Sequence, residues 1–300
     1  MGPDSTAIVI SPDKGYRLPS LVMIYSLLKN HPHRRFKIYI LLDEVDPDWI
    51  QVHKELIYQM GSTVELIRVE SSLFSEFRSK YPYPPSAYYR VFAADLIPEE
   101  RVLYLDSDLL IHGSIEELIE LDMGAYPIAA VEDSLVDDQS HLSLKSTEGY
   151  FNSGVLLMDL NEFRDQKLGS RVAEYLKSNP EKIYFADQCG FNAVLKGNWM
   201  PLNPKWNFQS GFLNKDLKRG LTYSEREVVE AKKEPHIIHF TGASKPWKTD
   251  GKHSFRPLYW KYLQETPLAR KYPEDLSFVN LVKRLAPVKL RKLYWRYKAI

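Results

Sequence analysis

The stretch RVLYLDSDLLIHGSIEEL (residues 101–118) places two carboxylates, Asp106 and Asp108, directly after an apolar run. An apolar run of this kind is typical of a strand that is buried on both faces of a parallel sheet. Like charges two residues apart repel each other, and burying them without a partner is costly. The stretch therefore indicates either an acidic loop in water or a site that binds something cationic.

Strand and helix patterns alternate before this stretch. The predicted elements are strands at 7–10, 36–42 and 63–69 and helices at 18–30 and 47–60. Strands that alternate with helices pair in parallel through right-handed crossovers, and the run at 101–106 would join the same sheet. We expect an α/β fold with a mostly parallel central sheet over residues 1–265 and an appended tail over residues 266–300, predicted to be helical.

The composition is that of a globular protein, since 44% of the 300 residues are hydrophobic and 26% are charged. Cys189 is the single cysteine, which excludes an intrachain disulfide and a cysteine-rich zinc site and favours a reducing compartment. No apolar run approaches the roughly 18 to 20 residues of a membrane helix. The start of the chain has no signal-peptide pattern. We therefore expect a cytoplasmic protein.

The tail differs in charge from the rest of the chain. No acidic residue follows Asp275, whereas the basic residues there are Lys283, Arg284, Lys289, Arg291, Lys292, Arg296 and Lys298. Tyr294, Trp295 and Tyr297 lie among them. Basic and aromatic residues together are typical of a segment that docks on an anionic membrane surface, here the inner face of the cell membrane. A helix packed on the body is the alternative, and without a nucleic-acid motif we expect no nucleic-acid partner.

Ligands of an open parallel sheet bind at the carboxyl ends of its strands. Asp106 and Asp108 follow such an end, and in an extended segment residues i and i+2 project to the same side. Two carboxylates aimed at one point suit a divalent cation that also holds a diphosphate. A D-x-D sequence alone is equally compatible with a solvated acidic turn.

A second segment, HIIHFTGASKPWKTD (236–250), supplies further groups. It predicts a strand that ends near His239, then a turn with Gly242, and then Lys245. The histidine would add a third metal ligand, the glycine would let the backbone approach a phosphate, and the lysine would neutralise a phosphate. Taken alone, the segment also fits a core histidine and a surface lysine.

Four segments, RVLYLDSDLL, YFNSGVLLMDLNEFR, FADQCGFNAVL and HFTGASKPW, resemble in order and spacing the family 8 retaining glycosyltransferases. This family includes bacterial lipopolysaccharide galactosyl- and glucosyltransferases and glycogenin. The resemblance covers about residues 7–250 and implies a GT-A fold, which is Rossmann-like, with a UDP-hexose donor. It also implies a Mn²⁺ ion, with Mg²⁺ as the alternative, that is held by Asp106, Asp108 and His239.

The resemblance assigns roles to individual residues. Those implied to bind the donor are Asp13, Arg90, Asp106, Ser107, Asp108, Asn152, Ser153, Gly154, Gly242 and Lys245. It places Tyr16 and Asp133 on the acceptor side. It implies that Asp187 binds hydroxyl groups of the sugar and that Gln188 lies at the reactive face of the sugar. For Arg90, the alternative to donor binding is an ion pair at the protein surface.

The same residues indicate how transfer proceeds. A retaining hydrolase would place a carboxylate nucleophile where this chain has Gln188, which is a poor nucleophile. We therefore favour front-side attack, in which a phosphate oxygen of the leaving UDP takes the acceptor proton. A transient covalent adduct on a nearby carboxylate stays open.

Three departures from the family pattern leave the acceptor open. Pro82 replaces a histidine of several relatives, Lys14-Gly15 replace an Asp-Asn pair, and WNFQSGF (206–212) lacks a Pro-Thr pair. The acceptor is a glycan or is lipid-linked or protein-linked. With 19 tyrosines, a self-glycosylating glycogenin-like scaffold is an alternative, as is a non-catalytic sugar-binding protein. A phosphatase of the Asp-x-Asp-x-Thr type is disfavoured, because Leu110 takes the threonine position.

Overall fold

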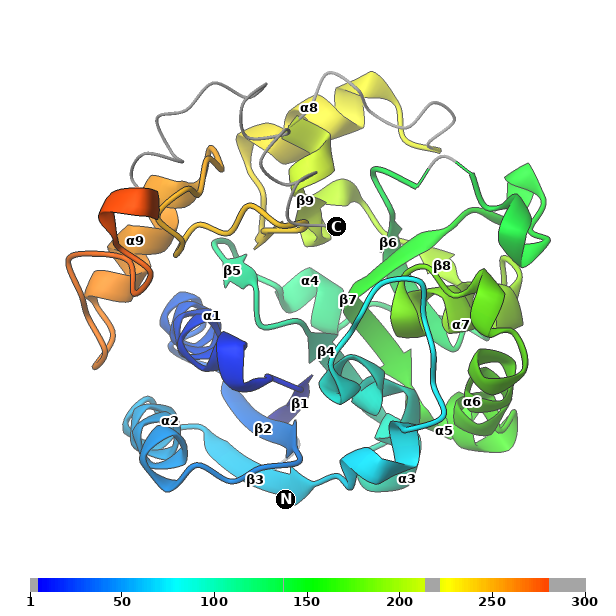
Figure 1. Ribbon diagram of the computed structural model, residues 1–300, viewed down its shortest axis with the longest axis horizontal. Coiled ribbons are helices and arrows are strands. Elements are labelled where there is room, and N and C mark those ends of the chain that lie inside the picture. Colours follow the sequence, from blue (N-terminus) through cyan, green and yellow to red (C-terminus); the bar gives the residue numbers. More distant parts are fainter. Residues whose placement is uncertain (1–4, 137, 214–221, 281–300) are drawn as a thin grey trace.

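The computed structural model describes residues 5–136, 138–213 and 222–280 (Figure 1). Within these ranges seven strands form a central sheet: β1 Ser5–Ile10, β2 Arg35–Leu42, β3 Thr63–Arg68, β4 Arg101–Leu105, β6 Ile128–Glu132, β7 Phe151–Asp159 and β8 Met200–Pro201. Three short strands form a second sheet: β5 Leu109–Ile111, β9 Phe208–Gln209 and β10 Ile237–His239. The α-helices are α1 Arg17–Asn30, α2 Pro47–Gln59, α3 Ala93–Leu96, α4 Glu116–Ile119, α5 Leu160–Asp165, α6 Leu168–Ser178, α7 Ala186–Leu195, α8 Glu225–Lys233 and α9 Arg256–Gln264.

The first elements form where the sequence predicts them because their start and stop signals are strong. At α2, the Asp46 side chain accepts the Trp49 N–H at 3.2 Å, and Pro47 occupies the first turn. Beyond its end, Gly61 adopts a φ of 77°, a conformation that favours glycine. The predicted strands and helices up to β3 are thereby confirmed.

The central sheet is mixed. Its order is β3-β2-β1-β4-β7-β6-β8, in which β1 pairs in parallel with β2 and β4, and β2 pairs in parallel with β3. Strand β7 runs antiparallel to both of its neighbours, β4 and β6. Strand β6 pairs in parallel with β8, so six of the seven strands of this sheet run in one direction and β7 opposes them. The prediction of a mostly parallel sheet is therefore confirmed, although an apolar run did not encode the opposite direction of β7.

Side chains of the inner strands alternate between two cores. Val9 and Tyr39 face a core that α6 and α7 cover, whereas Ile8 and Ile38 face a core that α1 and α2 cover. Figure 1 shows these two helix pairs on opposite sides of the sheet. Burial on both faces explains why these strands read as continuous apolar runs.

The order of the strands creates a switch point at the centre of the sheet. The chain runs outward from β1 through β2 to β3 and returns as β4 on the other side of β1. A turn, Asp106–Ser107–Asp108, then leads from β4 directly into β5 of the second sheet. The two aspartates therefore lie in a turn and not, as predicted, in an extended segment. This turn joins the two sheets.

The second sheet is held from outside by helices. Strand β10 lies between β5 and β9, antiparallel to β5 and parallel to β9. On α1, Ser26 Oγ accepts the Ile111 N–H at 3.0 Å, and α9 packs Tyr259 against Ile238 and Phe240. The predicted strand that ends near His239 is confirmed, and it belongs to this second sheet.

Two predictions about the C-terminal part remain predictions. Helix α9 ends at Gln264, close to the predicted boundary at residue 265. The basic and aromatic residues of the tail, from 283 to 298, lie outside the described residues. Among the helices that the structure describes, none is long and apolar enough to cross a membrane.

Candidate active site

A cavity of about 630 Å³ opens at the carboxyl ends of β1 and β4. This is the edge where open α/β sheets bind ligands, and the volume is typical of a small-molecule site. The predicted site residues that line it are Asp13, Tyr16, Arg90, Asp106, Ser107, Asp108, Asp133, Asn152, Ser153, Asp187, Gln188, His239 and Gly242. Gly154 and Lys245 lie directly behind this lining, against Asp106 and Asp108 respectively.

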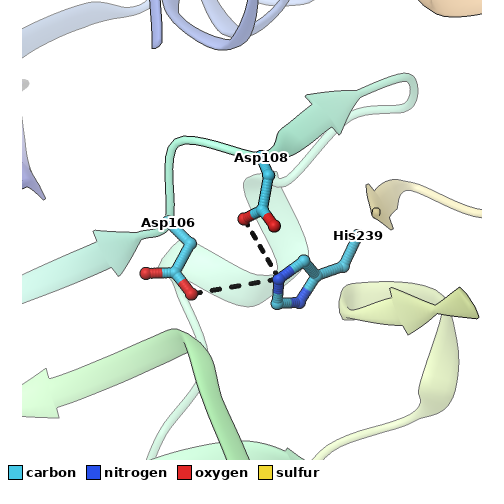
Figure 2. A group of neighbouring side chains, drawn as sticks. All are labelled: Asp106, Asp108 and His239. Atoms are coloured by element: carbon cyan, nitrogen blue, oxygen red, sulfur yellow. Dashed lines mark ion pairs between the residues drawn. The ribbon is translucent and has the colours of Figure 1, made fainter. Parts of the chain in front are cut away.

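Three potential metal ligands converge where the two sheets meet (Figure 2). Asp106 directly follows β4, Asp108 precedes β5 and His239 ends β10, and their ligand atoms all lie within 4.8 Å of one another. The His239 Nε2 atom is 3.2 Å from Asp108 Oδ1 and 3.9 Å from Asp106 Oδ2. Neighbouring ligands of a small octahedral cation are about 3 Å apart, so small shifts would complete the site. Two carboxylates and an imidazole fit a divalent cation such as Mn²⁺.

Gly154 leaves space for two of these side chains, His239 and Asp106. A Cβ atom at this position would lie 2.2 Å from His239 Cε1 and 2.8 Å from Asp106 Oδ2. The Gly154 carbonyl also accepts the Asp106 N–H at 2.8 Å, which fixes the start of the turn. Gly242 differs, because an added Cβ would meet no atom within 4 Å, and its φ of 81° is what favours glycine there.

Arg90 is a buried counter-ion beneath the cavity. It lies on the 3₁₀ helix Pro85–Phe92, and its Nη1 is 3.0 Å from Asp106 Oδ1 while its Nε is 3.2 Å from Asp187 Oδ2. The guanidinium carbon is 4.1 Å from the centre of the Tyr104 ring. Because the residue is only 5% exposed, the alternative of a surface ion pair is wrong.

The pKa values of two buried carboxylates of the site, Asp108 and Asp187, shift in opposite directions. Burial alone would raise the pKa of Asp108, but the adjacent Lys245 ammonium brings this pKa below its ordinary value. The Lys245 ammonium donates to Asp108 Oδ2 and, at 2.8 Å, to the Phe240 carbonyl, so this lysine is not a surface residue. Burial raises the pKa of Asp187 to about 6, although the Arg90 guanidinium opposes the rise.

Hydrogen bonds fix the side chain of Gln188 at the start of α7. Its Oε1 accepts from Asn152 Nδ2 at 3.2 Å and from the Ser153 N–H at 3.1 Å. Its Nε2 donates to Asp133 Oδ2 at 3.2 Å. Asp133 Oδ2 also accepts from Asn152 Nδ2 at 3.2 Å. The amide of Gln188 therefore has one defined orientation at the wall of the cavity.

Asp13 and Tyr16 lie at the mouth of the same cavity. The Asp13 Oδ1 caps the 3₁₀ helix Lys14–Tyr16 by accepting two of its N–H groups, which leaves the other oxygen for a ligand. The Tyr16 ring packs edge-on against Trp247, 5.6 Å between ring centres, and burial raises the Tyr16 pKa to about 12. The tyrosine is therefore neutral near pH 7.

Two buried amides of the site were not predicted from the sequence. Asn207 precedes β9, and its Oδ1 lies 2.9 Å from His239 Nδ1. Gln209 lines the cavity, and its Oε1 accepts the Ser134 N–H at 2.9 Å. Both belong to the segment WNFQSGF (206–212), in which the Pro-Thr pair of the family pattern is absent. Two amide side chains that alternate with aromatic ones in this segment were the available signal.

Known proteins share this sequence pattern and fold. The profile described as "Glycosyl transferase family 8" matches residues 7–251. General stress protein A of Bacillus subtilis is 30% identical, over 86% of this chain and 93% of that protein. A lipopolysaccharide 1,2-glucosyltransferase of Escherichia coli is 24% identical, over 90% of this chain and 84% of its own length. Some relatives are longer: the chain spans 61% of the length of Streptococcus pneumoniae GlyF, at 27% identity.

The solved structures agree on the fold. The galactosyltransferase LgtC, crystallised with donor and acceptor sugar analogues, superposes with a TM-score of 0.77 at 21% identity. The match covers 90% of this chain and 98% of LgtC. The α/β architecture with its mixed central sheet is thus a GT-A fold, as predicted.

Replacement of Gly154 by alanine tests whether His239 and Asp106 need the space that this glycine leaves. The added methyl group must displace the His239 ring, so we expect Mn²⁺ affinity to fall about 10-fold or more, as when the support of a ligand is lost. Titration with Mn²⁺, followed by the electron paramagnetic resonance of the free ion, measures this affinity.

Gly190→Ala is the matched control, because that buried glycine in α7 would meet the Val172 and Leu176 side chains and none of the three ligands. Its Mn²⁺ affinity should equal that of the parent. Parental affinity in Gly154→Ala as well would show that the glycine has no steric role at the site.

Proposed function

The chain belongs to glycosyl transferase family 8 and is a glycosyltransferase, and we propose that it moves a hexose, galactose or glucose, from a UDP-sugar to a glycan, lipid-linked or protein-linked acceptor. We propose a Mn²⁺-dependent reaction that retains the configuration at the anomeric carbon. The supporting observation is the convergence of Asp106, Asp108 and His239 at the wall of a cavity of about 630 Å³. The names of the Escherichia coli relative and of LgtC, a glucosyltransferase and a galactosyltransferase, support a hexose.

Groups around the turn would bind the diphosphate of the donor. A divalent cation held by the three ligands would stabilise the negative charge that develops on UDP as it leaves. Lys245, whose ammonium lies at Asp108, adds a positive charge at the same place. Gly242 lines the cavity without a side chain, so the backbone of its turn can approach a phosphate.

Groups on the other side of the cavity would bind the sugar. Asp187, paired with Arg90, would accept hydrogen bonds from sugar hydroxyl groups. The amide of Gln188 would lie beside the anomeric carbon and stabilise its positive charge in the transition state. Ser107, Asn152 and Ser153 line the cavity between these groups and complete the donor site.

The proposed step is a front-side displacement. The bond from the anomeric carbon to the phosphate oxygen breaks and its electron pair leaves with UDP. An acceptor oxygen bonds to the same face of that carbon, and its proton passes to a phosphate oxygen of UDP. No carboxylate occupies the position of Gln188, so the step needs no covalent sugar on that residue.

Asp108→Asn tests the metal requirement. The substitution keeps the size of the side chain and removes its charge, so we expect a folded protein that has lost transfer. Release of UDP from a panel of UDP-sugars in Mn²⁺ measures the activity and also identifies the hexose. Asp122→Asn, at an exposed turn, is the matched control and should keep parental activity. Full activity of the parent in EDTA after complete removal of metal would refute the proposal.

Gln188→Ala tests the transition-state role. We expect a small residual kcat and a nearly unchanged KM for the donor, because the amide acts mainly in the transition state. Gln51→Ala, at an exposed helix position, is the control with parental kinetics. Intact-mass analysis of the parent during turnover gives a second readout. A hexose adduct on Gln188 would contradict this role.

The tail carries a separate proposal. We infer that residues 266–300 attach the enzyme to an anionic membrane surface and so bring the site to a lipid-linked acceptor. The basic and aromatic residues after Val282 support this. Truncation before Val282 should abolish sedimentation with anionic vesicles and leave turnover on a short soluble acceptor unchanged. Equal sedimentation of the truncated and full chains at low salt would refute the anchor.

A further inference from the structure

Asn207 connects the three metal ligands to the amides on the opposite wall. It directly precedes β9 and is completely buried. Its Oδ1 is 2.9 Å from His239 Nδ1, and its Nδ2 donates to Asn152 Oδ1 at 3.0 Å. The oxygen of this amide therefore contacts a candidate metal ligand, and its nitrogen contacts the group of amides around Gln188.

The contact with Asn207 determines which nitrogen of His239 carries hydrogen. An amide oxygen only accepts, so the ring must donate from Nδ1. A neutral imidazole with hydrogen on Nδ1 has a free lone pair on Nε2. That Nε2 is the atom that faces Asp106 and Asp108 (Figure 2). Asn207 thus holds the ring in the tautomer that a metal ligand needs.

The other end of Asn207 acts together with the backbone N–H groups of Gly154 and Ser153 to orient the next two amides. Asn152 Oδ1 accepts from Asn207 and, at 3.1 Å, from the Gly154 N–H, so its Nδ2 must donate in the opposite direction. That Nδ2 donates to Gln188 Oε1, and Gln188 Nε2 donates to Asp133. Since Asp133, when ionised, can only accept, the direction of every hydrogen bond in the series is consistent from His239 to Asp133.

We propose that Asn207 is a positioning residue for the transfer reaction. It presents Nε2 of His239 to the cation and, through Asn152, turns the amide of Gln188 toward the sugar. The inference rests on the proposed function, because it takes His239 as a metal ligand and Gln188 as a group that faces the donor. Asn207 does not line the cavity, yet it would affect both the candidate metal ligands and the amides that face the sugar.

Two substitutions separate the two contacts. Asn207→Leu keeps the branching and the number of side-chain heavy atoms and removes both contacts, so the ring loses its partner. Asn207→Asp keeps an acceptor for the Nδ1 hydrogen, as in the carboxylate–histidine–metal arrangement, but it has no donor for Asn152. A carboxylate oxygen at position 207 would then face the Asn152 Oδ1 atom without a hydrogen between them. The series of hydrogen bonds from His239 to Gln188 would be interrupted at this point.

Metal affinity tests the first contact. With Mn²⁺ alone, followed by the electron paramagnetic resonance of the free ion, we expect Asn207→Leu to bind about 10- to 100-fold more weakly than the parent. Asn207→Asp should bind at least as tightly as the parent. If the leucine variant does not fold, as judged by circular dichroism, Asn207→Ala takes its place in the same titration.

Steady-state kinetics at saturating Mn²⁺ tests the second contact. We expect Asn207→Asp to lower kcat on the order of tenfold, the effect of one lost hydrogen bond in the transition state, with little change in the KM for the donor. A merely structural asparagine would not separate metal affinity from kcat in this way. Asn203→Asp is the matched control: it is exposed, it caps the 3₁₀ helix Pro204–Trp206, and it should be parental in both assays.

The outcomes are distinct. Parental Mn²⁺ affinity in Asn207→Leu would overturn the role toward His239, and an unchanged kcat in Asn207→Asp would overturn the role toward Gln188. A parent that binds no Mn²⁺ would overturn the proposed metal site and this inference with it. Parental binding without any change in the variants would overturn the inference alone.

Discussion

The charges of Asp106 and Asp108 are the constraint on which the rest of the site depends. The turn that carries them joins the two sheets and is largely shielded from water, where an unpaired carboxylate is unstable. The Arg90 guanidinium pairs with Asp106, and the Lys245 ammonium pairs with Asp108. A divalent cation on the remaining oxygens would complete the same balance, so the arrangement that makes the turn stable also suits it to a metal ion.

The second sheet owes its position to its surroundings. Strands of two or three residues cannot form an independent sheet, so helices and the central sheet must hold β5, β9 and β10. Helix α1 does so through Ser26, and α9 does so through Tyr259. Because β10 carries His239 and β9 follows Asn207, packing far from the cavity contributes to the geometry of the three candidate metal ligands.

Elements with strong local signals could be predicted from the sequence. Elements that form through pairing between distant segments could not. The early strands and helices have long apolar runs, caps and a stopping glycine, and all were predicted. The direction of β7 and the existence of β5 and β9 depend on pairing between distant segments, which no local pattern encodes. Among the site residues, those in family motifs were predicted and do lie together around the cavity, although their roles remain proposals. Asn207 was missed because a single asparagine before a two-residue strand has no pattern of its own.

The two sides of the cavity differ in how tightly their residues are constrained. On the proposed donor side, nearly every polar side chain is buried and bonded to another, so a substitution leaves a buried partner unsatisfied. At the rim, Tyr83 and Leu135 also line the cavity and are 39% and 49% exposed. Exposed loop side chains change at little cost in stability, and binding preferences are often determined by them. If the acceptor binds at this exposed rim, the asymmetry explains why the sequence indicates the reaction class and leaves the acceptor open: the residues on the proposed donor side are tied to the stability of the fold, and those at the rim are not.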